Sequence, residues 1–122
     1  MFKYENNRMK IDNYVYDFKF EIRNVIQYNN NYIILLSIPF NNSEINNLYC
    51  LNSKAELLWQ AQDLKSLFPD LKNLLPYEQM GIKEDYIYAS DFYGRCYKIN
   101  INNGKIITKN YVGKNIENYD SM

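Results

Sequence analysis

The chain has 122 residues, a length that fits one domain spanning 1–122 better than two. Hydrophobic residues make up 47% of it, which is ordinary for a globular domain and argues against intrinsic disorder. Its 14 basic residues balance its 14 acidic ones. Because no surplus of positive charge attracts phosphate backbones, nucleic acid is not an expected partner.

The amino-terminal residues and the longest apolar run bear on localisation. Residues 1–8 are polar and lack the apolar stretch of a signal peptide. The longest aliphatic run, residues 33–36, is far too short to cross a membrane. These features predict a cytoplasmic protein without a membrane partner. In that reducing compartment, Cys50 and Cys96 are expected to be buried small hydrophobic residues and not a disulfide.

The first predicted element is a strand over residues 14–22. Apolar side chains alternate there with mostly charged ones, which is the period of a strand with one apolar and one polar face. The apolar positions are Tyr14, Tyr16, Phe18, Phe20 and Ile22. The polar face carries Asp17 and Glu21, which are either solvated or available to a partner.

Two groups of four short strands follow, a first meander over residues 25–61 and a second over residues 79–112. Asn-rich turns separate the strands, because Asn tolerates left-handed backbone angles and caps turns. The expected strands are 25–28, 32–38, 47–51 and 56–61 in the first group, and 79–83, 86–90, 95–101 and 105–112 in the second. The Asn103-Gly104 pair predicts a type I′ hairpin turn.

A leucine-rich connector, about residues 63–75, joins the two groups. Its leucines have helical spacing, and Asp63 stands at the expected N-cap. Pro69 interrupts the pattern because it lacks a backbone N–H, so one short helical segment is expected. Connectors on rigid β scaffolds often carry function, which makes Asp63 and Asp70 candidates for partner contact. The leucines could equally serve to anchor the connector over the sheets.

The two strand groups resemble each other in sequence. Asn47-Leu-Tyr-Cys-Leu-Asn followed by Glu56-Leu-Leu-Trp matches Arg95-Cys-Tyr-Lys-Ile-Asn followed by Lys105-Ile-Ile-Thr. The pattern resembles the four-stranded blades of β-propellers of the quinone-enzyme type. Two blades cannot close a propeller. We therefore expect a mainly β fold in which two antiparallel four-stranded meanders stack as a β-sandwich or flattened barrel, with the short helical connector between them.

Residue types that carry catalysis are scarce. The chain has no His, which removes His-based nucleophilic systems, general bases and most metal sites. Its four glycines form no phosphate-binding pattern. Glu84, Asp85 and Asp91 could in principle form a carboxylate pair, but a hairpin tip at Glu84-Asp85 and a turn cap at Asp91 explain them more simply. We therefore expect a protein without enzymatic activity, cofactor or metal.

The loop over residues 90–95 has the clearest signature of a binding surface. It places Asp91, Phe92, Tyr93 and Arg95 in one tight turn, and Tyr and Arg are favoured at the centres of protein interfaces. The alternative is a purely structural hairpin whose Phe92 packs into the core.

In size, Asn-, Ile- and Tyr-rich composition and single β domain, the chain resembles the immunity proteins of bacterial toxin–immunity pairs, including those of contact-dependent growth inhibition. The resemblance implies a 1:1 complex with a cognate toxin domain whose active site is blocked. It also implies that the toxin is a nuclease, such as an EndoU-like RNase. Acidic groups, Glu84 and Asp85 among them, would then face a basic cleft. The alternative is a small ligand- or carbohydrate-binding β module without catalysis.

Overall fold

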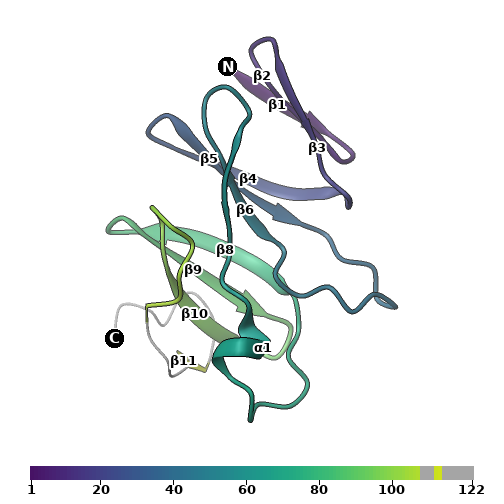
Figure 1. Ribbon diagram of the computed structural model, residues 1–122, viewed down its shortest axis with the longest axis vertical. Coiled ribbons are helices and arrows are strands. Elements are labelled where there is room, and N and C mark those ends of the chain that lie inside the picture. Colours follow the sequence, from purple (N-terminus) through teal and green to yellow (C-terminus); the bar gives the residue numbers. More distant parts are fainter. Residues whose placement is uncertain (108–111, 114–122) are drawn as a thin grey trace.

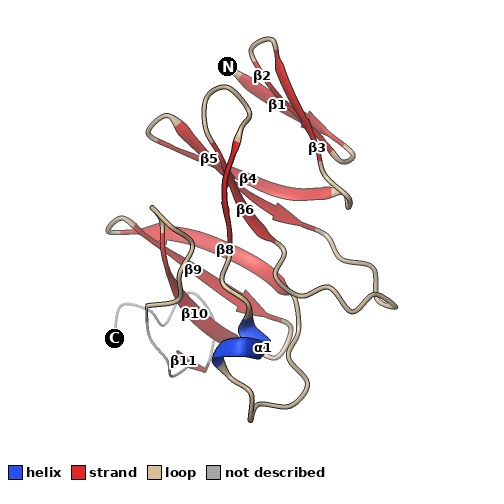
Figure 2. Cartoon of the chain, viewed as in Figure 1, coloured by secondary structure: helices blue, strands red, loops and turns tan. Residues whose placement is uncertain are grey.

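The computed structural model describes residues 1–107 and 112–113. Within this part the chain folds into three antiparallel sheets and one short helix (Figures 1 and 2). The predicted mainly β fold with two four-stranded meanders is confirmed. No sheet in this part closes into a barrel, and a small third sheet precedes the two meanders. None of the helices described is long and apolar enough to span a membrane.

The amino-terminal sheet was not predicted. Its strands are β1 (Phe2–Glu5), β2 (Arg8–Ile11) and β3 (Tyr14–Asp17). Tight turns join them, and Asn6 and Asp12 adopt positive φ angles of 54° and 52° there. Asn and Asp tolerate this backbone region better than other side chains, so these turns have a local cause in the sequence.

The prediction of a single strand over residues 14–22 is wrong. The strand β3 ends at Asp17, and the next strand, β4 (Ile22–Tyr28), belongs to a different sheet. The chain bends at residues 19 and 20. Just before the bend, the Phe18 N–H donates to the Asn7 carbonyl at 2.8 Å, and the Phe18 carbonyl accepts from the Asn7 side chain at 2.6 Å. Phe18 and Ile22 nevertheless pack into one cluster. The alternation of apolar and polar residues therefore continues through the bend, and the sequence pattern does not reveal where the strand ends.

The two meanders have the strand orders β4-β5-β6-β7 and β8-β9-β10-β11. After β4, the strands are β5 (Asn31–Leu36), β6 (Leu48–Leu51), β7 (Leu57–Gln60), β8 (Tyr77–Lys83), β9 (Tyr86–Asp91), β10 (Arg95–Asn100) and β11 (Val112–Gly113). Seven of the eight predicted strands are thus found near their expected bounds. The eighth, over 105–112, falls partly on residues 108–111, which lie outside the described part.

The three sheets form layers, with the β4–β7 sheet between the other two (Figure 1). The strand β5 shows this arrangement most directly. Tyr32, Ile34 and Leu36 pack into the cluster shared with the amino-terminal sheet. Ile33 and Leu35 pack into the cluster shared with the second meander. Because both faces of β5 are covered, its sequence is a continuous apolar run instead of an alternating one.

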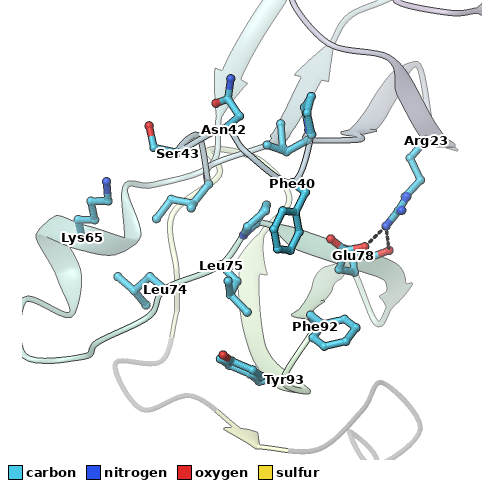
Figure 3. A pocket seen from close by; sticks show the side chains of 14 residues that line it. Arg23, Phe40, Asn42, Ser43, Lys65, Leu74, Leu75, Glu78, Phe92 and Tyr93 are labelled. Atoms are coloured by element: carbon cyan, nitrogen blue, oxygen red, sulfur yellow. Dashed lines mark hydrogen bonds and ion pairs between the residues drawn. The ribbon is translucent and has the colours of Figure 1, made fainter.

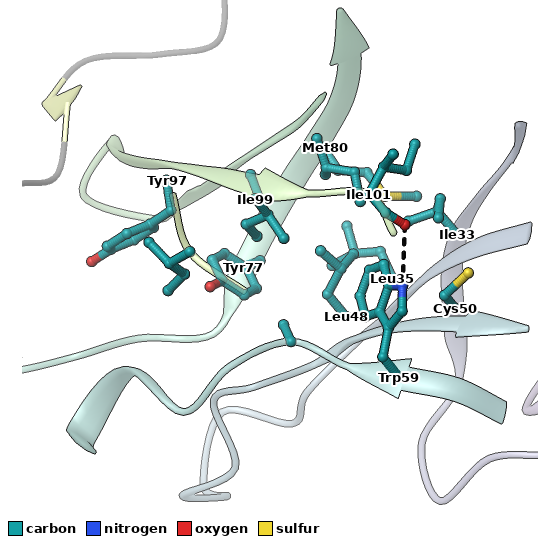
Figure 4. Packing of buried hydrophobic residues seen from close by; sticks show 14 of the residues in the cluster. Ile33, Leu35, Leu48, Cys50, Trp59, Tyr77, Met80, Tyr97, Ile99 and Ile101 are labelled. Carbon is teal, nitrogen blue, oxygen red and sulfur yellow. Dashed lines mark hydrogen bonds between the residues drawn. The ribbon is translucent and has the colours of Figure 1, made fainter. Parts of the chain in front are cut away.

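The two meanders share one core (Figure 4) and are also linked at one edge. In the core, the Trp59 indole N–H donates to the Ile101 carbonyl at 3.1 Å. At the edge formed by β4 and β8, Arg23 pairs with Glu78, and the Tyr28 hydroxyl donates to Asp85. From the first pair to the second, the residue numbers increase on both strands, so β4 and β8 run in the same direction. The first strands of the two meanders therefore lie beside each other.

The connector contains the predicted short helix, α1 (Leu64–Leu67), and Asp63 is confirmed as its N-cap. An Asp63 carboxylate oxygen accepts from the Lys65 backbone N–H at 3.2 Å. The helix ends at Phe68, directly before Pro69, because a proline cannot continue the hydrogen-bonding pattern. Beyond it the chain runs through turns to β8.

The prediction of a type I′ turn at Asn103-Gly104 is wrong, although the chain does turn there. Only Gly104 of the pair has a positive φ, of 75°, and its N–H donates to the Asn100 carbonyl at 2.8 Å in a longer turn. The two-residue turn with positive φ at both positions is instead Glu84-Asp85, at 52° and 68°. The tip of a hairpin predicted for these two residues is thereby confirmed.

Cys50 and Cys96 are both buried and unbridged, as expected. Burial raises the pKa of the Cys50 thiol to about 11. The neutral thiol therefore prevails at physiological pH, and Cys50 behaves as a small apolar residue.

The Tyr77 hydroxyl is a buried polar group in the core, and its effect on stability can be tested. Tyr77 is completely buried, and its hydroxyl has no hydrogen-bond partner in the described part of the chain. Burial also raises the pKa of Tyr77. Because an unpaired buried hydroxyl costs free energy, Tyr77→Phe is expected to raise the free energy of unfolding by about 1 kcal/mol in urea denaturation.

A control for this variant is Tyr49→Phe, because the Tyr49 hydroxyl accepts a hydrogen bond from the Gln60 amide at 3.1 Å. That variant should leave the free energy of unfolding unchanged or slightly lower. A Tyr77→Phe protein less stable than the natural one would show that the hydroxyl has a partner.

Candidate functional site

A groove of about 650 Å³ opens between the two meanders (Figure 3). Its walls come mainly from the loop after β5, the end of the connector and the turn between β9 and β10, with single charged residues from β4, α1 and β8. Its apolar and aromatic lining residues are Ile38, Pro39, Phe40, Ile45, Leu74, Leu75, Pro76, Phe92 and Tyr93. The groove therefore exists only in the folded protein.

Three aromatic side chains at this groove are strongly exposed. Phe40 is fully exposed, Phe92 is 81% exposed and Tyr93 is 62% exposed. Phe92 therefore does not pack into the core, which was the alternative considered for its loop. Single exposed apolar residues are common, whereas a cluster of them around one groove is typical of interaction surfaces. The sequence analysis predicted Phe92 and Tyr93 as partner contacts, and this stays a prediction.

The turn that carries Phe92 and Tyr93 is held by a buried ion pair. The Asp91 carboxylate accepts from the Arg95 backbone N–H at 3.0 Å and from its Nε at 2.7 Å. The Asp91 side chain is 1% exposed and the Arg95 side chain 12%. These two predicted contact residues are thus structural supports of the aromatic turn. Asp91 also caps this turn, as predicted.

Arg95 further fastens the turn to the connector. Its Nη2 donates to the Asn73 carbonyl at 2.6 Å, and its guanidinium lies 5.2 Å from the centre of the Tyr93 ring. Asn73 adopts a positive φ of 57° within the connector. Arg95 therefore fixes Tyr93 and the connector relative to each other. Such preorganisation lowers the entropy lost when a partner binds.

Phe40 lies on a closed turn of the loop after β5. The Asn42 N–H donates to the Pro39 carbonyl at 3.0 Å, and the Asn42 side chain accepts from the Glu44 N–H at 2.9 Å. Pro39 restricts the backbone before Phe40. The ring is thus presented to solvent by a turn with internal hydrogen bonds.

Charged groups lie on opposite sides of the groove in Figure 3. Arg23 pairs with Glu78 on one side, and it also donates to the Glu78 carbonyl at 3.1 Å. Lys65 lies on the other side. Among residues 1–107 and 112–113, no carboxylate pairs with the Lys65 ammonium group. The nearby Asp63 instead accepts from Asn46 and Ser66, each at 2.9 Å.

These hydrogen bonds, the one from Asn46 foremost, lower the pKa of Asp63. A lowered pKa means that the carboxylate form stabilises the fold above the pKa of the unfolded chain. That contribution disappears as the pH falls through the lowered value.

The remaining acidic candidates do not gather at the groove. Asp17 lies on β3 and pairs with Arg8 at 2.7 Å, and the hydrogen bond from Arg8 lowers the pKa of Asp17. Asp70 is exposed in the connector, and Glu84-Asp85 form the hairpin tip at the far end of β8. The predicted acidic surface is therefore dispersed over three parts of the molecule.

Glu21 is hydrogen-bonded to the loop that lines the groove. Its carbonyl accepts from the Ser37 N–H at 2.7 Å, directly before Ile38 of the groove lining. The side chain of Glu21 is exposed.

Sequence reasoning missed Phe40 and Lys65 as parts of the site, and it did not predict the Arg23–Glu78 ion pair. Phe40 had a usable signal, because it is a lone aromatic between Pro39 and two Asn residues in an otherwise polar turn. Lys65 and the ion pair had none, because their importance comes from their position beside segments distant in the chain. No cluster of three potential metal-ligating side chains occurs in the part of the chain described.

The fold and the groove together define a small layered β protein with an apolar, aromatic-rimmed surface. The chain belongs to a family described as a domain of unknown function, DUF7957, whose model matches residues 1–111. No curated protein matches the chain.

Among solved structures, the chain is similar to the computationally designed Ika8 protein, with a TM-score of 0.54 and 7% sequence identity. The similarity covers 93% of this chain and 38% of the designed one, so the chain spans well under half of that protein's length. At this identity the likeness concerns the fold alone.

Proposed function

We propose that the protein is an immunity protein that binds and neutralises a cognate toxin domain in a 1:1 complex through the groove and its aromatic rim. The observation that carries the proposal is the cluster of Phe40, Phe92 and Tyr93 around one groove. Aromatic residues anchored on a rigid scaffold are the usual centres of binding energy in protein interfaces. The toxin side of the pair, a nuclease in the family context above, rests on the resemblance stated there.

The dispersed acidic residues favour one mode of inhibition over another. Since the described residues form no acidic patch at the groove, electrostatic matching to a basic cleft receives no support from this surface. We propose instead that the toxin active site is blocked mainly by apolar contact, with the aromatic turn against the rim of the toxin's cleft. Such contacts slow dissociation more than they speed association.

The test is a binding experiment with the toxin domain encoded immediately upstream of this protein's gene. We expect a 1:1 complex by size-exclusion chromatography with light scattering. Phe92→Ala should weaken the complex about 10- to 100-fold in calorimetry, the range of a hot-spot residue. Tyr14→Ala is the matched control, because Tyr14 is an exposed aromatic residue on the amino-terminal sheet, away from the groove lining.

Two outcomes would contradict the proposal. The first is a neighbouring toxin gene that is missing or whose product does not bind. The second is a complex weakened by Tyr14→Ala and unaffected by Phe92→Ala, which would place the interface on another face.

The groove volume favours a second candidate, a small ligand- or carbohydrate-binding module. A volume of about 650 Å³ falls within the range of ordinary ligand pockets, and aromatic side chains at its rim could stack on sugar rings. A glycan array together with a thermal-shift screen separates the two candidates. Saturable binding of a glycan that is abolished by Phe92→Ala would favour the module.

A further inference from the structure

We infer that the groove binds a peptide segment of its protein partner that combines large apolar side chains with a carboxylate, and that Lys65 pairs with this carboxylate. The inference rests on the proposed role of the groove as a protein-binding surface. It adds the chemistry of the segment that enters, which the proposed function leaves open.

The apolar part of the segment follows from the lining. The middle of the groove is formed by aliphatic and proline side chains from two segments, with Leu74 and Leu75 on the connector and Ile38 on the loop after β5. Phe40 and Phe92 add exposed rings at its border. A volume of about 650 Å³ is larger than a single side chain, so the groove fits a short stretch of chain. Burying apolar side chains there removes the exposed rings from water at the same time.

The carboxylate follows from the balance of charge at the groove. Within residues 1–107 and 112–113, three charged side chains line it: Arg23, Glu78 and Lys65. Arg23 and Glu78 neutralise each other. Lys65 then provides one positive charge that no carboxylate of the described residues pairs with. A partner carboxylate would form a charge-assisted hydrogen bond with it, whereas a basic segment would be repelled.

The separation of these groups also indicates where the acidic residue of the segment stands relative to its apolar residues. Figure 3 shows Lys65 and the Arg23–Glu78 pair on opposite sides, with Leu75 between them. Asp63, the acidic residue closest to Lys65 in sequence, has both carboxylate oxygens engaged by Asn46 and Ser66. The acidic residue of the segment should therefore flank its apolar residues at one end.

The inference can be tested with a phage-displayed library of random twelve-residue peptides selected against the full chain. We expect enriched peptides to carry Asp or Glu beside large apolar residues. A synthetic peptide of this kind should bind Lys65→Glu at least 10-fold more weakly than the natural protein, and exchanging its acidic residue for Lys should restore binding to Lys65→Glu. Phe40→Ser should weaken binding to a similar extent.

Lys54→Glu is the matched control, because Lys54 is exposed in the turn between β6 and β7 and does not line the groove. This variant should bind the peptide as the natural protein does. The inference is overturned if no peptide is enriched, if the enriched peptides lack an acidic residue, or if Lys65→Glu binds them within twofold of the natural protein. A concentration-dependent dimer that Lys65→Glu abolishes in sedimentation would overturn it in favour of a second copy as the occupant.

The toxin experiment separates the failure of this inference from the failure of the proposed function. If the toxin domain binds the natural protein and Lys65→Glu equally well, the inference fails and the proposed function stands. If peptides follow the expected pattern but the toxin domain does not bind, the proposed function fails and the inference stands.

Discussion

Asn47→Ala is expected to lower the free energy of unfolding by about 3 kcal/mol, because it removes three buried hydrogen bonds. The Asn47 amide donates to the carbonyls of Leu36 and Tyr77 at 2.7 and 2.9 Å. Its oxygen accepts from the Tyr77 N–H at 2.8 Å. This one side chain therefore joins the end of β5 to the start of β8, and alanine would leave these backbone groups unpaired in the interior.

Urea denaturation followed by tryptophan fluorescence measures this effect, since Trp59 lies in the core shared by the two meanders. Asn41→Ala provides the control, because Asn41 is exposed in the loop after β5, and it should change the free energy of unfolding by at most about 0.5 kcal/mol. Asn47→Asp should also destabilise the fold, because it loses both donated bonds and buries a charge. Equal stability of the Asn47→Ala and Asn41→Ala proteins would show that the connection between the sheets does not depend on Asn47.

Asp91→Ala is expected to lower the free energy of unfolding by about 3 to 4 kcal/mol. The substitution leaves the Arg95 guanidinium nearly buried without its carboxylate, and it removes the acceptor of the Arg95 backbone N–H. It also releases the turn that carries Phe92 and Tyr93. At temperatures where the variant is still folded, we therefore expect weaker partner binding as well.

The comparison that tests this prediction is between two ion pairs of different burial. Arg8→Ala breaks the exposed Arg8–Asp17 pair, and it should have little effect on stability because solvent screens such pairs. Arg95→Lys keeps the charge but loses the forked geometry, and it should be destabilising too. The double variant Asp91→Ala with Arg95→Ala should cost less than the sum of the single changes. An Asp91→Ala protein as stable as Arg8→Ala would contradict the role of the buried pair.

The positions of most strands could be predicted because local sequence and local structure agree there. Asn and Gly residues tolerate the backbone angles of the turns, and β-branched and aromatic residues fill the strands between them. Asp63 and Pro69 fix the start and the end of α1 by chemistry within a few residues. Such features need no information from the rest of the chain.

Two predictions failed for reasons that local pattern cannot reveal. The alternation over residues 14–22 runs unbroken through a bend. The reason is that Phe18 before the bend and Ile22 after it pack into the same hydrophobic cluster. The Asn103-Gly104 pair is compatible with a type I′ turn, yet Trp59 packs beside Gly104. A Cβ atom at this glycine would approach the Trp59 ring to 2.5 Å. The turn geometry there is set together with a residue of the other meander.

The sequence by itself therefore determined a mainly β chain of two similar meanders, its short helix and the aromatic turn at Phe92 and Tyr93. Only the tertiary structure decided that Arg95 forms a buried ion pair with Asp91 beneath this turn and that Phe40 and Lys65 line the same groove. The physical reason is that strand periodicity and turn chemistry act over a few residues. A groove forms where segments far apart in the chain, such as those of Phe40 and Phe92, are brought together by packing of the sheets between them.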